Sequence, residues 1–133
     1  MIFIDTGAFL GRFLIGDQHH VRALELWKKA DRQSEHCVTS NFVLDETFTF
    51  LARRSNYSYA AEKARVTYRS NILHILRPVL EDELAALDVF EKFADQQVSF
   101  TDCVSFVLMR KNKIRRAFSF DGHFERAGFA LWA

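Results

Sequence analysis

Apolar residues fall into short continuous runs that alternate with stretches of helical periodicity. The runs predict strands at 2–4, 36–40, 72–76, 115–120 and 129–133. Between them, apolar positions recur every three or four residues and predict helices over 17–33, 41–54, 58–71, 81–95 and 98–106, with a short helical turn over 121–128. Strands separated by helices form βαβ units. The sequence therefore predicts a Rossmann-like α/β fold whose central, mainly parallel sheet has about five strands flanked by helices.

Local signals set some of the expected boundaries. Asp17 is expected to open the helix over 17–33, because aspartate is a good N-cap residue. Ser55 and Asn56 separate two helices, and Pro78 closes the third strand. No segment is assigned between the first strand and Asp17.

Composition indicates one globular domain over residues 1–133. A chain of 133 residues with 49% apolar residues buries roughly two-thirds of its unfolded surface. The start of the chain does not resemble a signal peptide, and no apolar run reaches the ~18 residues of a membrane span, so we expect a cytoplasmic protein without a membrane partner. Cys37 and Cys103 lie in apolar surroundings without CxxC spacing, which predicts buried free thiols rather than a disulfide or a His/Cys metal site.

In an open α/β sheet, ligands bind beyond the carboxyl ends of the strands. Asp5 directly follows the first strand, and Asp121 directly follows the strand that ends in "AFSF". Each aspartate alone has an ordinary structural explanation, as a helix N-cap or a turn residue. Both are nevertheless candidates for a site at this edge.

Glu46 is the more informative acid. On a helix over 41–54 it falls between Phe42 and Phe50 on the apolar arc, whereas Asp45 faces the polar gap. A buried glutamate needs a partner, and no basic residue lies at helical spacing within "VLDETFTFL". The structural alternative is a glutamate at the margin of the buried face that reaches water or a distant arginine.

Asp102 lies among apolar residues in "VSFTDCVSF". Ser99 would cap this helix with Asp102 at its third position, where an acid suits the positive helix end. That explanation and a functional one both stand on sequence alone. Together, however, four acids from distant segments would meet at one edge, and clustered carboxylates without bases suit a hard cation such as Mg²⁺ or Mn²⁺.

The four acidic segments resemble those of PIN-domain ribonucleases, particularly the VapC-type toxins. They are "FIDTGAFL", "SNFVLDETFTFL", "SFTDCVSFVLMRK" and "AFSFDGHFERAGF", and they occur in family order along the whole chain. The resemblance implies a metal-dependent endoribonuclease with acidic ligands at Asp5, Glu46, Asp102 and Asp121. It also implies supporting hydroxyls at Thr6 and Ser119.

The same resemblance implies a reaction and partners. A Mg²⁺ ion, or Mn²⁺, held by the acids would activate a water that attacks the RNA phosphodiester, without a histidine as general base. One ion and two ions are both compatible with the residues. VapC-type toxins are often homodimers and are often neutralised by a small antitoxin protein, so both partners are expected besides RNA.

Binding of RNA also requires basic side chains that contact its phosphates. The run "RKNKIRR" is a candidate for phosphate contacts, as is Arg12; its basic residues are Arg110, Lys111, Lys113, Arg115 and Arg116. This run would instead be a solvated loop if it lay at the opposite end of the sheet from the acids. Arg53, Arg54 and the cations of "EKARVTYR" are rival candidates, and the sequence does not choose among them.

Three alternative functions remain at this point. A phosphoacceptor or phosphatase-type α/β domain also places an aspartate after its first strand, but "DTG" lacks the second acid of a DxD motif. A PIN-fold RNA-processing nuclease outside any toxin-antitoxin pair, or an inactive PIN scaffold, would carry the same residues. The RNA target is not readable from the sequence.

Aromatic residues near the expected early helices suggest a surface for a partner or a second copy. They are Phe9, Phe13, Phe48, Tyr57 and Tyr59, together with the aliphatic Leu14. Ordinary core packing is the alternative.

Overall fold

A computed structural model describes all 133 residues and contains one five-stranded sheet. The strands are β1 (Ile2–Ile4), β2 (Cys37–Ser40), β3 (Leu73–Leu76), β4 (Arg116–Phe118) and β5 (Ala130–Leu131). Their order is β3-β2-β1-β4-β5, and every neighbouring pair is parallel. The predicted Rossmann-like α/β fold with a parallel sheet is therefore confirmed.

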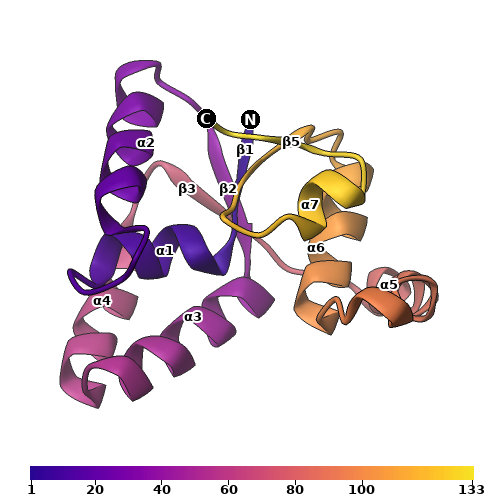
Figure 1. The fold of residues 1–133 in the computed structure, drawn as a ribbon, viewed down its shortest axis with the longest axis horizontal. Helices are drawn as coiled ribbons and strands as arrows, with labels where there is room; N and C mark the ends of the chain where they lie inside the picture. Colours follow the sequence, from indigo (N-terminus) through magenta and orange to yellow (C-terminus); the bar gives the residue numbers. More distant parts are fainter.

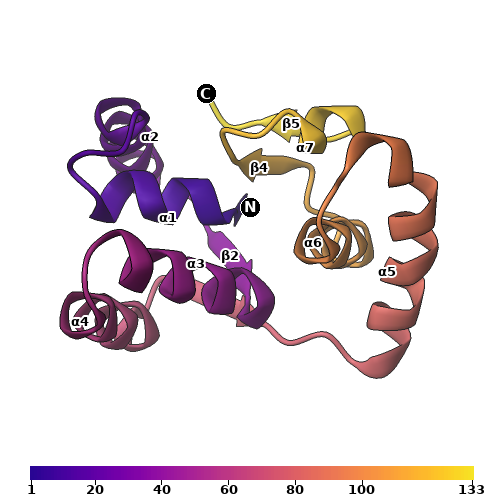
Figure 2. The same ribbon diagram turned by 60° about the horizontal axis from the view of Figure 1, so that its bottom comes forward.

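Helices cover the sheet on both sides. They are α1 (Thr6–Phe13), α2 (His20–Arg32), α3 (Asn41–Arg54), α4 (Tyr57–Arg69), α5 (Leu80–Lys92), α6 (Phe100–Lys111) and α7 (His123–Arg126), with a short 3₁₀ turn, η1, at Ala94–Gln96. Figure 1 shows α1, α2 and α4 on one side of the sheet and α5 and α6 on the other. Turning the molecule shows α5 as an outer helix beyond α6 (Figure 2). The carboxyl ends of the central strands lead directly into the starts of α1 and α3.

Helix α1 was not expected from the sequence. Its two glycines, Gly7 and Gly11, lower helix propensity and interrupt the apolar pattern. Gly11 is required by packing, because a Cβ there would lie 2.8 Å from the Cβ of Ala23 on α2. The close contact between α1 and α2 therefore explains why a glycine, which made the helix hard to predict, occupies position 11.

Helix α2 begins at His20, not at Asp17 as predicted. The Asp17 side chain accepts a hydrogen bond from the His19 N–H at 2.8 Å, and its carbonyl accepts one from the His20 N–H at 3.0 Å. Asp17 therefore closes a turn ahead of the helix rather than capping it. The chain ends α5 at Lys92 and continues as η1, so that helix is also shorter than predicted.

The core is built from aromatic and branched side chains around β1. All of β1 is buried, and Phe3, Phe106, Phe118 and Phe124 are fully enclosed. Cys37 and Cys103 are buried free thiols, as predicted. No helix is long and apolar enough to cross a membrane. Because β1 is the central strand, the residue that follows it lies in the interior.

Most of the side chains predicted to form a partner surface pack against the core: Phe9 is buried, and Phe13, Leu14, Phe48 and Tyr59 are half-buried. Phe9 is only 2% exposed, and the Tyr59 hydroxyl donates to the Phe13 carbonyl at 2.6 Å. Of that set only Tyr57, 82% exposed, stands free in solvent. Exposed apolar side chains gather instead on α5, where Leu80, Leu84, Leu87 and Phe90 are exposed. We refer to these four residues as the α5 apolar face.

Candidate active site

Asp5 lies where β1 passes into α1, at the centre of the sheet edge. Its backbone N–H donates to the Phe118 carbonyl at 3.0 Å, which fixes it between β1 and β4. Although Asp5 is the N-cap residue of α1, its side chain makes no capping hydrogen bond. Asp5 as a whole is 5% exposed; its Oδ2 accepts from the Ser119 hydroxyl at 2.8 Å, and its Oδ1 has no partner. The capping explanation for Asp5 is thus not realised.

Ser119 links Asp5 to the fourth predicted acid. Its Oγ donates to Asp5 and accepts from the Asp121 N–H at 3.0 Å. Asp121 follows β4 and accepts at Oδ1 from the His123 N–H at 2.9 Å. One buried hydroxyl therefore fixes both the Asp5 carboxylate and the backbone that presents Asp121.

Glu46 reaches the same edge from α3. Its Oε1 accepts from the Thr6 hydroxyl at 2.6 Å, and it forms no ion pair with a lysine or arginine. Glu46 is half-buried while Asp45 is exposed, so the inward and outward directions predicted from helical periodicity are confirmed. Ser40 caps α3 by accepting from the Val43 N–H, which sets the start of the helix that carries Glu46.

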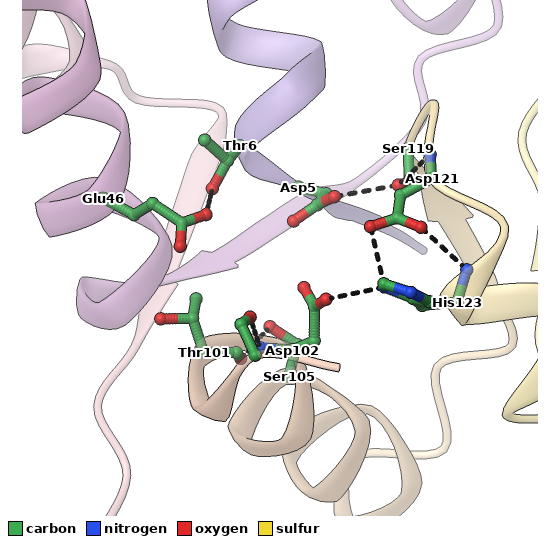
Figure 3. Close-up of polar contacts among 10 residues, drawn as sticks. Asp5, Thr6, Glu46, Thr101, Asp102, Ser105, Ser119, Asp121 and His123 are labelled. Carbon is green, nitrogen blue, oxygen red and sulfur yellow. Dashed lines mark hydrogen bonds and ion pairs between the residues drawn. The ribbon is translucent and has the colours of Figure 1, made fainter. Parts of the chain in front are cut away.

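Asp102 comes from the first turn of α6. The predicted cap is present, since the Ser99 hydroxyl accepts from the Asp102 backbone N–H at 3.1 Å. That bond uses the Asp102 backbone and leaves its carboxylate free to face Asp5 and Asp121 (Figure 3). Asp102 therefore serves the cap of α6 through its backbone N–H while its side chain belongs to the acid cluster.

His123 completes the cluster and was not anticipated. Its Nδ1 lies 2.9 Å from Asp121 Oδ2 and 3.3 Å from Asp102 Oδ2, as drawn in Figure 3. Because it faces two carboxylate oxygens, Nδ1 is the donor. The sequence offered one signal for His123, namely its position two residues after Asp121. The Asp121 side chain closes a turn by accepting from the His123 N–H, and this turn brings the histidine back toward the acids.

Burial and mutual repulsion perturb the two most enclosed acids. Desolvation first, and then the nearby charge of Asp102, raises the pKa of Asp5 to about 7. Desolvation, with the charges of Asp121 and Glu46, raises the pKa of Asp102 to about 7. No lysine or arginine forms an ion pair with any of the four acids. The chain itself therefore supplies no lysine or arginine charge to balance these carboxylates.

The donor set fits a hard divalent cation. Asp5, Glu46, Asp102 and Asp121 all line one cavity, with Glu46 at the side nearest Thr6, and Asp5 Oδ1 is buried without a hydrogen-bond donor. Ligand oxygens of Asp102 and Asp121 lie within 4.8 Å of one another, close enough to share an ion. Oxygen ligands of this kind suit Mg²⁺ or Mn²⁺.

Comparison with known proteins agrees with this arrangement. The family model described as PIN domain matches residues 2–130. The chain belongs to the PIN-domain family. A 23S rRNA-specific endonuclease, VapC20 of Mycobacterium tuberculosis, is 34% identical over 129 residues, which are 97% of this chain and 95% of that protein. A VapC ribonuclease of Archaeoglobus fulgidus is 30% identical over 124 residues, 91% of this chain and 77% of the relative.

The solved structures extend the likeness to three dimensions. The crystal structure of M. tuberculosis VapC20, described as a sarcin-ricin loop cleaving toxin, matches with a TM-score of 0.88 and 32% identity, over 98% of this chain and 97% of that one. This PIN domain is thus of the VapC type, as its four acidic segments predicted.

A cavity of about 490 Å³ lies over the acids of this PIN domain. Asp5, Glu46, Asp102 and Asp121 line one part of it, and the 17–19 turn and the end of α3 line another. Arg54 is the only lysine or arginine in its lining. Of the basic residues considered for RNA contact, the rival candidate Arg54 is therefore the one at the site.

The other basic candidates lie elsewhere. Arg12 lines a separate cavity of about 710 Å³, and its guanidinium lies 4.8 Å from the Trp27 ring. The "RKNKIRR" run joins α6 to the start of β4, the opposite end of the strand from Asp121. Within the run, Lys111 pairs with Asp82 at 3.1 Å and Arg116 with Glu35 at 2.8 Å. None of Arg110, Lys111, Lys113, Arg115 and Arg116 lines the acidic cavity, and RNA contact by them stays a prediction.

Replacing His123 by alanine tests its part in the cluster. The change removes the donor between Asp102 and Asp121, so we expect the free energy of unfolding in chelator to fall by ~1 kcal/mol. In saturating Mg²⁺ the loss should shrink, because the cation then offsets the repulsion between the acids. Thermal melts in both conditions measure this, with the exposed His74→Ala as control. An equal loss in both conditions would show that His123 acts only through packing.

Proposed function

We propose that this PIN domain is a divalent-metal-dependent endoribonuclease, the toxin of a toxin-antitoxin pair, that cleaves RNA phosphodiester bonds through a metal-activated water. One observation carries the proposal: four carboxylates from four separate segments converge without a lysine or arginine partner, and the most buried one keeps an oxygen without a donor. The relatives support it, since they are named as an rRNA endonuclease and a ribonuclease.

In this proposal Asp5, Glu46 and Asp102 hold a Mg²⁺ ion, or Mn²⁺, and Asp121 holds a second ion or acts at the margin of the first. When bound, such an ion lowers the pKa of a water and offsets the charge that develops on the phosphate. The Ser119 hydroxyl orients the Asp5 carboxylate through its 2.8 Å bond. The Thr6 hydroxyl does the same for Glu46 at 2.6 Å. In this proposal both hydroxyls act as positioning residues for the acids.

The proposal is tested by incubating the purified chain with end-labelled RNAs of varied sequence in Mg²⁺, in Mn²⁺ and in chelator. Cleavage at internal positions is expected with either metal and not with chelator. Absence of cleavage on every RNA with both metals would contradict it. A parallel beryllofluoride titration covers the phosphoacceptor alternative, which the family match does not favour; adduct formation at Asp5 would revive it.

The toxin role has its own test, because an RNA-processing nuclease would cut RNA equally well. Induced expression of the chain is expected to arrest bacterial growth. Co-expression of the proposed antitoxin, sought as a short reading frame next to the gene, should relieve the arrest. Growth unaffected by active protein would favour the RNA-processing alternative. Residence in the cytoplasm follows from the same proposal.

A homodimer is also proposed, formed through the α5 apolar face. Helix α5 packs mainly on α6 and is the outer helix in Figure 2. Its side chains Leu80, Leu84, Leu87 and Phe90 are exposed. Apolar side chains grouped at helical spacing are typical of an interface.

Changing Leu84 and Leu87 together to glutamate is expected to convert the protein to a monomer, measured by sedimentation at several concentrations. Because both side chains are exposed, the change should leave the melting temperature of the monomer nearly unchanged. Tyr57→Ser is the control on the surface first considered from sequence. If Tyr57→Ser dissociated the dimer and the α5 change did not, the proposed interface on α5 would be wrong and the interface would instead lie on α4.

A further inference from the structure

The acidic cavity has a second wall that the proposed chemistry does not use. His19 and Phe120 line it and stack face to face, with ring centroids 4.2 Å apart and planes 2° from parallel. Both side chains are half-buried. Phe120 directly precedes Asp121, so this aromatic pair is attached to the acid cluster by the backbone itself.

Arg54 belongs to the same wall. Its Nη1 lies 3.5 Å from Asp17 Oδ2, and the other oxygen of that carboxylate accepts from the His19 N–H at 2.8 Å. Asp17 therefore links the guanidinium to the turn that carries the histidine ring. The Arg54 side chain is 54% exposed, and its ion pair with Asp17 is long, so its remaining donors are free for an anion.

These features are the ones that hold a single-stranded nucleotide. Bases stack on aromatic rings with little regard to sequence, and arginine binds the adjoining phosphate. The cavity volume of about 490 Å³ lies within the range of pockets that hold small molecules. A base can reach such a wall only when it is unpaired, which excludes a nucleotide inside a duplex.

We propose that His19, Phe120 and Arg54 form a nucleotide subsite beside the acids, in which one unpaired base stacks on the aromatic pair and its phosphate contacts Arg54. The proposal rests on the ribonuclease activity proposed above, and it adds the residues that would hold the base and the phosphate of one nucleotide. The subsite also explains how a cavity lined by five acids and one arginine accepts a polyanion: the cation at the acids and Arg54 provide positive charge at two separate points.

The test compares binding of a short single-stranded RNA with that of an abasic ribose-phosphate chain of the same length, measured by fluorescence anisotropy in Ca²⁺. The parent protein is expected to bind the RNA about tenfold more tightly than the abasic chain. His19→Ala should remove that preference, and His19→Phe should restore it, because phenylalanine keeps a stacking ring. Phe120→Leu should also remove it, but Phe120 packs on Phe118, so its melting temperature is measured alongside.

Arg54 and its neighbour provide a matched pair. Arg54→Gln should weaken binding of both chains by the same factor, whereas Arg53→Gln, at an exposed position outside the cavity, should change neither. Equal affinity of the parent for the RNA and the abasic chain would overturn the subsite, as would a His19→Phe variant as weak as His19→Ala. Cleavage activity is read separately: cleavage without a base preference refutes the subsite alone, and a base preference without cleavage refutes the proposed function alone.

Discussion

Asp5→Asn is expected to abolish metal-dependent RNA cleavage while leaving the metal-free protein as stable as the parent or more stable. The buried Asp5 carboxylate is destabilised by desolvation and by Asp102, so neutralising it removes an unfavourable interaction when no cation is present. The amide oxygen still accepts from Ser119, so packing is kept. We expect a loss of activity of at least about 100-fold and a melting temperature in chelator that is unchanged or a few degrees higher. Cleavage assays and melts in chelator measure both.

Glu46→Gln and Asp102→Asn should behave in the same way. Asp102→Asn keeps the cap of α6, which uses the backbone N–H of that residue. Asp45→Asn, on the exposed side of α3, is the control and should keep full activity. Acids that served only as caps or ion-pair partners would behave oppositely, losing ~1 kcal/mol on becoming amides. Amide variants that melt lower in chelator yet still cut RNA would make the four acids structural and refute the proposed function.

The metal-free protein is expected to lose stability as the pH rises from about 4 to about 7. In this window the unfolded chain has released the protons of Asp5 and Asp102, whose ordinary pKa is 3.8, while the folded chain retains them up to about 7. The folded state binds more protons, so the free energy of unfolding falls with pH and levels off above about 7. A decrease of about 1 kcal/mol or more is expected from the two groups together.

Mg²⁺ should reverse this trend, because it binds the ionised carboxylates and competes with their protons. The gain in melting temperature on adding millimolar Mg²⁺ is therefore expected to be small near pH 5 and larger near pH 8. Melts across this range with chelator and with Mg²⁺ measure it, and the double variant with Asp5→Asn and Asp102→Asn should show neither dependence. A Mg²⁺ effect that is the same at both pH values in the parent protein would place the ion away from these two acids.

Much of the fold and most of the acid cluster could be predicted from the sequence. Apolar runs and helical periodicity gave the parallel sheet, because in α/β proteins burial on both faces of the strands and on one face of each helix imposes those patterns directly. Asp5 and Asp121 follow strands whose carboxyl ends lie at one edge of the sheet. A helix turns by about 100° per residue, and this rotation alone directs Glu46 toward the core and Asp45 toward solvent. These inferences rest on local geometry that the chain carries in its order of residues.

Only the tertiary structure decided which neighbours complete the site. Helix α1 was not predicted because Gly11, which weakens the helical pattern, is required by close packing against Ala23 on α2. A contact between two distant helices leaves no local pattern in the sequence. His123 reaches Asp102 across 21 residues of sequence, and His19 reaches Phe120 across a far longer separation. The position of the basic residues also depended on tertiary structure. The positive charge of "RKNKIRR" is visible in the sequence, but the end of the sheet at which it lies depends on how the helices cross. Sequence by itself determined which residues had to be buried and where the acids gathered, whereas packing between distant elements determined what they touch.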